Sequence, residues 1–253
     1  MNLFRALACA LGFLTRIPAP RTTYTPDVLG LSSGFFPLVG LLLGGIWAGA
    51  FWLLRDLPPH PWWTVALLAV HALATGALHL DGLADLVDGL GGSRGDRERA
   101  LEIMRDTRIG SFAVVALIFF LAAKGIALHE TLRTPRAWVF LLLAPLVARA
   151  AAVPLLAFFP CARPDGLARA FHERCGWPSL LLAGATAGAA LWIAGPALWV
   201  PSAAAAGAAL ALGAAAAVRL KGLTGDVIGA AIETAELAFL FAAAAPRILG
   251  GAA

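Results

Sequence analysis

A segment of 42 residues, from position 177 to position 218, contains no charged residue. A helix needs about 20 apolar residues to cross the hydrocarbon core of a bilayer. The stretch is therefore too long for one crossing, and two prolines near its middle, Pro196 and Pro201, interrupt a single helix. It predicts two consecutive membrane-spanning helices joined by a short connection.

Charge is scarce along the rest of the chain as well. Only 13% of the 253 residues are charged and 60% are hydrophobic, whereas a soluble domain carries about 25% charged residues. This excludes an ordinary cytosolic enzyme, a disordered protein and, with three cysteines at unrelated spacings, a disulfide scaffold. We expect an all-α, polytopic integral membrane helix bundle, with residues 1–253 forming a single membrane-embedded catalytic domain.

Seven segments have the length and hydropathy of membrane spans, each crossing about 30 Å of hydrocarbon. The predicted spans are residues 33–54, 62–80, 109–128, 137–159, 178–193, 201–218 and 227–245. The N-terminal 20 residues contain a short apolar run without a convincing signal-peptide cleavage site. We expect them to be retained as an interfacial or re-entrant segment.

The basic residues are distributed unequally between the two sides of the predicted bundle. With a cytoplasmic N-terminus, 13 Lys and Arg side chains lie on the cytoplasmic side and 4 on the other. This asymmetry follows the positive-inside rule and predicts a multi-pass protein of a prokaryotic cytoplasmic (inner) membrane. It also places the acidic segment 81–106 and the turn at Asp226 on the cytoplasmic face, where one active site could use both.

Three aspartates, Asp81, Asp85 and Asp88, follow one another at spacings i, i+4 and i+7. On a helix this spacing puts all three carboxylates on one face, where they repel one another. Oxygen ligands of this kind suit Mg²⁺ or Mn²⁺, so we predict metal ligation; the alternative is a solvated helix end. His79 could bind substrate or transfer a proton, or it could be structural.

A second charged segment, residues 95–110, has the pattern of an amphipathic helix. Arg105 and Arg108 would share one face of that helix and could clamp a diphosphate by bidentate hydrogen bonds. Asp106 between them could bind metal or orient an arginine. The alternative interpretation is a membrane anchor with local salt bridges, which we favour for the earlier arginines of the segment.

The last predicted span begins with a tight turn that contains Thr224 and Asp226, and it carries Glu233 and Glu236 within its apolar part. Carboxylates inside a membrane are costly by a few kcal/mol each, are usually functional and need partners. We predict substrate contacts for Thr224, Asp226 and Glu236, and a catalytic role for Glu233. A structural buried pair is the alternative.

Glu233 and Glu236 require cationic partners within the membrane. Lys221, Arg149 or the metal are the candidates, and Arg149 could also hold a substrate phosphate. Lys124 lies inside a predicted span, where we expect it to snorkel towards the interface. Arg16 lies in the FLTRIPAP segment, which could cover the site and contact substrate or could simply anchor the chain.

The segments HLDGLADLVDG, LEIMRDTRIG and TGDVIGAAIETAE, with the earlier FLTRIPAP and FPLVGLLLG, resemble the cobalamin 5′-phosphate synthase family. The resemblance extends over nearly the whole chain. It implies a Mg²⁺-dependent transferase that joins adenosylcobinamide-GDP to α-ribazole or its 5′-phosphate. The implied products are adenosylcobalamin or its 5′-phosphate, and GMP.

The resemblance also implies roles for the charged residues. Asp81, Asp85, Asp88 and Asp106 are expected to bind Mg²⁺, while Arg105 and Arg108 hold the phosphates. The ribazole 3′-hydroxyl attacks the phosphate on the cobinamide side and GMP leaves. The general base stays open, with three candidates: Asp85, Glu233 and His79.

Two other functions fit parts of the pattern. A CDP-alcohol phosphotransferase also uses spaced aspartates at a membrane surface, but its DGxxAR motif is not matched, because Asp85 follows Ala84 where that motif has Arg. A proton-coupled transporter could use the intramembrane glutamates. Such a transporter should show paired repeats, and no clear repeat is present in this sequence. The expected partners are the two substrates and the lipid bilayer, with a homo-oligomer possible and no nucleic acid.

Overall fold

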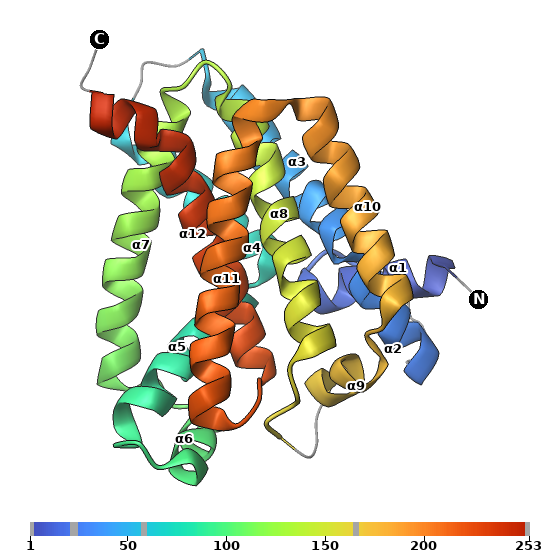
Figure 1. Ribbon diagram of the computed structural model, residues 1–253. Helices are drawn as coiled ribbons and strands as arrows, with labels where there is room; N and C mark the ends of the chain where they lie inside the picture. Colours follow the sequence, from blue (N-terminus) through green and yellow to red (C-terminus); the bar gives the residue numbers. More distant parts are fainter. Residues whose placement is uncertain (1–2, 21–24, 57–59, 164–166, 251–253) are drawn as a thin grey trace.

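The computed structural model describes residues 3–20, 25–56, 60–163 and 167–250. Within these residues the regular elements are helices, so the all-α prediction is confirmed. The long helices run side by side (Figure 1); they are α3 (Phe36–Leu54), α7 (Ser111–Leu132), α8 (Ala137–Phe158), α10 (Trp177–Ala194), α11 (Trp199–Leu220) and α12 (Gly225–Gly250). The shorter elements are α1 (Leu3–Leu14), α2 (Pro26–Ser32), η1 (Ser33–Phe35), α4 (Pro61–Thr75), α5 (Leu78–Gly92), α6 (Arg97–Ile103), α9 (Leu167–Arg174) and η2 (Pro196–Leu198).

Six helical segments of the described chain are long and apolar enough to cross a membrane, and the bent pair of α4 and α5 would be a seventh if the two helices form one span. The molecule is therefore a multi-pass membrane protein, as predicted from the hydropathy. The uncharged stretch that suggested two spans forms α10 and α11, which are separated by the turn of η2. Helix α1 lies roughly at right angles to the long helices (Figure 1).

The predicted second span, residues 62–80, is not one straight helix. Helix α4 ends at Thr75, and α5 leaves at an angle of 90°. The break occurs because Gly76 and Ala77 both adopt left-handed backbone angles, with φ of 62° and 56°, which end an α-helix. The main-chain N–H of Arg16 donates to the carbonyl of Ala74 at 2.9 Å and fastens the N-terminal segment to this break.

Helix α8 lies in the middle of the bundle and packs closely against α3. A Cβ atom on Gly40 or Gly44 would collide with the backbone of α8, at the carbonyls of Pro145 and Leu142. Glycine at these two positions allows α3 and α8 to approach each other closely. Helices α8 and α12 have the largest buried share among the spans.

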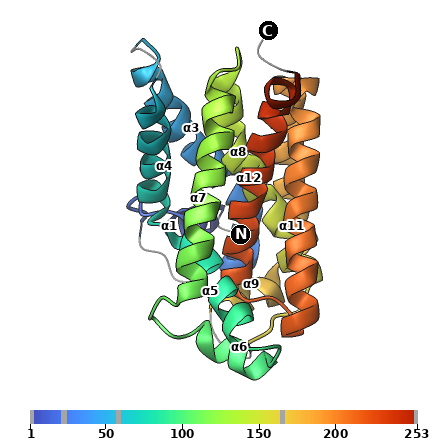
Figure 2. The same cartoon turned by 90° about the vertical axis from the view of Figure 1, so that its left-hand side faces the viewer.

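The connecting segments collect at one end of the bundle. Helices α5, α6 and α9 and the turn between α11 and α12 lie together there, which we name the α6 end (Figures 1 and 2). Figure 2 shows α5 and α6 beneath the long helices at this end. The predicted meeting of the acidic segment with the Asp226 turn on one face of the bundle is thereby confirmed.

Candidate functional site

The site is organised by a close contact between α5 and α12. A Cβ atom on Gly82 would lie 2.7 Å from the carbonyl oxygen of Asp226, and one on Gly229 would lie 3.2 Å from Cα of His79. Only glycine allows two backbones to approach this closely. The contact sets Asp81 of α5 beside Asp226 at the start of α12.

The carboxylates of α5 and α12 form one negatively charged group. Asp81 is exposed and Asp85 is half-buried on the next turn. The negative charges of Asp81, Asp226 and Asp88 act on the carboxylate of Asp85, and the cation that opposes them is Arg163. The mutual repulsion of these carboxylates would be reduced by a divalent cation or another cationic group bound between them.

Arg163 reaches this group through a pairing of two loops. The N–H of Ala162 donates to the Leu223 carbonyl, and the N–H of Leu223 donates to the Pro160 carbonyl, both at 2.8 Å. Arg163 then forms an ion pair with Asp226, with 3.0 Å between Nη2 and Oδ2. From the sequence, Arg163 is one of the 13 basic residues predicted for the cytoplasmic side, and nothing in the local sequence indicates this long-range pairing.

Thr224 supports Asp226 from within the turn. Its hydroxyl donates to Oδ2 of Asp226 at 3.1 Å and accepts from the N–H of Val227 at 3.3 Å, as a helix N-cap does. Thr224 itself is 1% exposed. It therefore orients Asp226, and its predicted contact with substrate stays a prediction.

Glu233 and Glu236 belong to a separate group inside the bundle, which we name the buried charge cluster. Lys124 Nζ donates to Glu233 at 2.6 Å and to Glu236 at 2.7 Å. Glu236 also accepts from Arg149 Nη1 at 2.7 Å and contacts His71 Nε2 at 3.2 Å. All five side chains are at most 4% exposed, so two anions and two cations balance one another away from water.

The contacts of the buried charge cluster differ from those predicted for Lys124 and Lys221. Lys124 does not snorkel to the interface, because it is the partner that both glutamates share. Lys221 is not their partner: it ends α11 with a left-handed φ of 55° and is exposed. Arg149 and Glu236 contact each other, and their predicted contacts with substrate stay a prediction.

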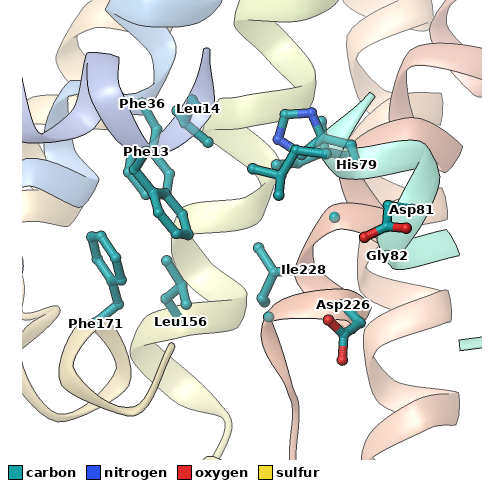
Figure 3. A pocket seen from close by; sticks show the side chains of 14 residues that line it. Phe13, Leu14, Phe36, His79, Asp81, Gly82, Leu156, Phe171, Asp226 and Ile228 are labelled. Carbon is teal, nitrogen blue, oxygen red and sulfur yellow. The ribbon is translucent and has the colours of Figure 1, made fainter. Parts of the chain in front are cut away.

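His79 connects the buried charge cluster to a cavity. Its Nδ1 lies 3.4 Å from Nη2 of Arg149. The side chain is 2% exposed, and its Nε2 has no hydrogen-bond partner among the described residues. His79 also lines a cavity of about 200 Å³ that reaches Asp81 and Asp226 (Figure 3).

The wall of this cavity includes the N-terminal segment. Phe13 and Leu14 line it, together with Phe36 and Phe171. Of the two alternatives left open for FLTRIPAP, a cover over the site or an anchor, this position favours the cover. Arg16, predicted to bind substrate, is exposed and lies along Gly76 at the break between α4 and α5.

The arginines expected to clamp a diphosphate are arranged differently from the prediction. Helix α6 ends at Ile103, so Arg105 and Arg108 do not share a helix face. Beyond the end of the helix, Asp106 accepts the main-chain N–H of Arg108 at 3.0 Å, a local bond that competes with helix. The side-chain and main-chain hydrogen bonds from Arg108 lower the pKa of the Asp106 carboxyl to about 2.

The comparisons with known proteins agree with this geometry. The model of the cobalamin-5-phosphate synthase family matches residues 6–244. The chain belongs to this family. The adenosylcobinamide-GDP ribazoletransferase of Syntrophobacter fumaroxidans is 41% identical over 93% of this chain and 96% of its own. Those of Pseudomonas entomophila and Leptothrix cholodnii are 40% and 38% identical, over 91% and 92% of this chain and 95% and 92% of theirs. No solved structure matches the chain.

In this member of the synthase family, the three sequence motifs converge at the α6 end. The first motif forms α5, the second runs from α6 to the start of α7, and the third opens α12. The proximity of Asp81 and Asp85 to Asp226 is predictable from the sequence, whereas the contacts of Arg163 and Lys124 are not.

Asp88, the third aspartate of α5, is bound by the first turn of α7. Its Oδ2 accepts the N–H of Gly110 at 2.6 Å and its Oδ1 accepts the N–H of Ala113 at 2.9 Å. A carboxylate at a helix N-terminus satisfies otherwise unpaired N–H groups and is attracted by the helix dipole. The structure thus gives Asp88 a partner within the protein, and its predicted metal ligation stays a prediction.

Replacing Asp88 with Asn tests this role. An amide presents one acceptor where α7 needs two, so we expect the free energy of unfolding to fall by about 1–2 kcal/mol, as for lost helix caps. Unfolding in detergent with EDTA present measures the loss without any metal. A variant as stable as wild type under these conditions would contradict the role, and Asp56→Asn, at an exposed site, is the control.

Proposed function

We propose that the chain joins adenosylcobinamide-GDP to α-ribazole or its 5′-phosphate with Mg²⁺, releasing GMP. The observation that carries this proposal is the meeting of the α5 carboxylates with Asp226 and Arg163 at one end of the bundle. The printed name of the relatives, adenosylcobinamide-GDP ribazoletransferase, supplies the substrates. We further propose that the α6 end faces the cytoplasm of the inner membrane, because the predicted excess of Lys and Arg lies there.

The donor set fits Mg²⁺. The site offers carboxylate oxygens, which are the ligands that this ion prefers. In the described part of the chain no three His, Cys, Asp or Glu side chains are arranged to hold an ion alone. Mg²⁺ does not require that, because it is usually held by one or two carboxylates plus water and substrate phosphates. Asp81 would hold it, with Asp226 beside it, and the bound ion would neutralise charge on the diphosphate.

Other side chains of the site can be assigned to phosphate binding and to proton transfer. Arg163, held next to Asp226, is placed to attract a phosphate oxygen. The attacking hydroxyl must lose a proton, and three residues were candidates for accepting it. Glu233 is ion-paired with Lys124 at 2.6 Å inside the bundle, and His79 faces the Arg149 cation. Asp85 lies within the carboxylate group, so we propose its carboxylate as the proton acceptor.

The reaction itself is the test of this proposal. Purified protein in detergent, given adenosylcobinamide-GDP and α-ribazole with Mg²⁺, is expected to release GMP and form the cobamide. Removal of the divalent ion with EDTA should abolish release, and added Mg²⁺ should restore it. Release of CMP from a CDP-alcohol instead would favour the phospholipid alternative, and no turnover of either donor would favour a transporter.

A further inference from the structure

The wall of the cavity opposite the carboxylates is aromatic. Phe13 of α1, Phe36 of α3 and Phe171 of α9 contact one another, with ring centroids 4.7 Å apart for Phe13–Phe171, 5.7 Å for Phe36–Phe171 and 6.1 Å for Phe13–Phe36. Figure 3 shows these rings on one side of the cavity and the carboxylates of Asp81 and Asp226 on the other. Aromatic rings brought together from three helices form a surface on which another flat ring can pack.

The size and lining of the cavity restrict what can enter it. Its volume of about 200 Å³ is below the roughly 300–1,000 Å³ of pockets that enclose a whole drug-sized ligand. A corrin ring is therefore too large. Guanine is small enough but carries several donors and acceptors. Apart from His79 and the carboxylates of Asp81 and Asp226 on one side, the lining consists of Leu, Ile, Phe and Gly residues, which leaves most of those groups without partners. A flat apolar ring system with a single acceptor is compatible with both limits.

His79 supplies the matching donor. Arginine only donates hydrogen bonds, so the Nδ1 atom that faces Arg149 must be the acceptor of the imidazole. The proton of the neutral ring is then on Nε2, which is buried and lacks a partner within the described chain. A buried N–H without an acceptor is unfavourable, and a ligand nitrogen in the cavity would satisfy it.

We propose that this cavity is the subsite for the benzimidazole ring of the ribazole, with His79 Nε2–H donating to its unsubstituted ring nitrogen. This assignment rests on the proposed function and concerns only the position of the benzimidazole ring in the cavity. With the ring in the cavity, the attached ribose extends towards Asp81 and Asp226. That is the side on which its hydroxyl is needed for attack. His79 is then a substrate-binding donor and does not act as the base.

Two substitutions of His79 separate these roles. The side-chain nitrogen of Gln can occupy the position of Nε2, whereas that of Asn reaches only the position of Nδ1. We expect His79→Gln to keep kcat/KM for α-ribazole within about 10-fold of wild type, and His79→Asn to lose about 10- to 100-fold through KM. KM for adenosylcobinamide-GDP should stay unchanged in both. Equal and larger losses of kcat in both variants would show a proton-transfer role and overturn the assignment.

A second experiment does not depend on how much of a variant is folded. Ile228 lines the cavity, and Ile228→Phe would fill part of it. We expect the ratio of kcat/KM for the dimethylbenzimidazole riboside to that for the unmethylated benzimidazole riboside to fall at least about 10-fold, because a smaller pocket rejects extra methyl groups. This ratio is measured within one preparation, so the fraction of active protein cancels.

The matched control is Ile118→Phe, at a position 62% exposed on α7, which should leave the ratio unchanged. An unchanged ratio in Ile228→Phe, an equal loss for both ribosides, or a loss confined to adenosylcobinamide-GDP would overturn the subsite. An equal loss is the result expected if a lipid chain fills the cavity. Wild-type protein that releases no GMP with either riboside would instead refute the proposed function.

Discussion

Replacing Asp81 with Asn is expected to lower GMP release about 10³-fold and to raise the Mg²⁺ concentration that half-maximal activity requires. The substitution removes a charge from a carboxylate that reaches the cavity beside Asp226, where the diphosphate is proposed to bind. The Asp81 carboxylate would act through the Mg²⁺ that it holds. Loss of a group that stabilises developing negative charge lowers kcat about 10²–10³-fold, so weaker binding of this ion is expected to have an effect of that size or larger. The measurement is GMP release against Mg²⁺ concentration in purified protein.

Asp85→Asn distinguishes proton transfer from metal binding. As the proposed base, Asp85 should contribute about 10²–10⁴-fold to kcat, and its loss should leave the Mg²⁺ concentration for half-maximal activity unchanged. A shift in that concentration would instead support the prediction from sequence that Asp85 is itself a metal ligand. Asp56→Asn, remote in sequence and exposed, is the control. If Asp81→Asn and Asp85→Asn both kept wild-type turnover, the assignment of this site would be wrong.

Replacing Lys124 with Met is expected to lower the free energy of unfolding by about 3–5 kcal/mol, the loss typical when one partner of a buried ion pair is removed. Lys124 holds Glu233 at 2.6 Å and Glu236 at 2.7 Å, and Met leaves two buried carboxylates with Arg149 as their remaining cation. Unfolding in mixed detergent–SDS micelles measures the change.

A charge-balanced variant separates electrostatics from packing. Lys124→Met combined with Glu233→Gln removes one charge of each sign and leaves Glu236 paired with Arg149. We expect the double variant to recover more than half of the lost free energy, whereas a cavity or packing defect would not be repaired. Lys221→Met, at an exposed position, is the matched control. A single variant that unfolds like wild type would contradict the role of the cluster.

Much of the fold could be predicted because apolar length and proline positions are local properties of the chain. The aspartates of α5 were found for the same reason, since i, i+4 and i+7 spacing implies one helix face. The break after Thr75 was not found, because Ala77 adopts a left-handed φ of 56° that its residue type does not favour. The interaction that fastens this break, from the Arg16 main chain, is distant in sequence.

The remaining site features depend on pairings that no local pattern contains. Arg163 meets Asp226 only because two loops, 63 positions apart at these residues, lie against each other. Lys124 seemed a snorkelling residue because the composition of α7 does not say which face meets α12. For Asp106 and Arg108 the charge pattern predicts a helix, but α6 ends at Ile103 and the Asp106 side chain accepts the main-chain N–H of Arg108, a bond that competes with helix.

The charges of the buried charge cluster enter the membrane in a fixed order during synthesis of the protein. Lys124 and Arg149 are translated well before Glu233 and Glu236, which arrive on the last helix. Until α12 enters the bilayer, the nascent chain holds two cations in a non-aqueous environment without their counter-ions, a state that membranes disfavour. The final helix is thus the one that balances the charge of the cluster, and a chain truncated before it would leave Lys124 and Arg149 without these counter-ions.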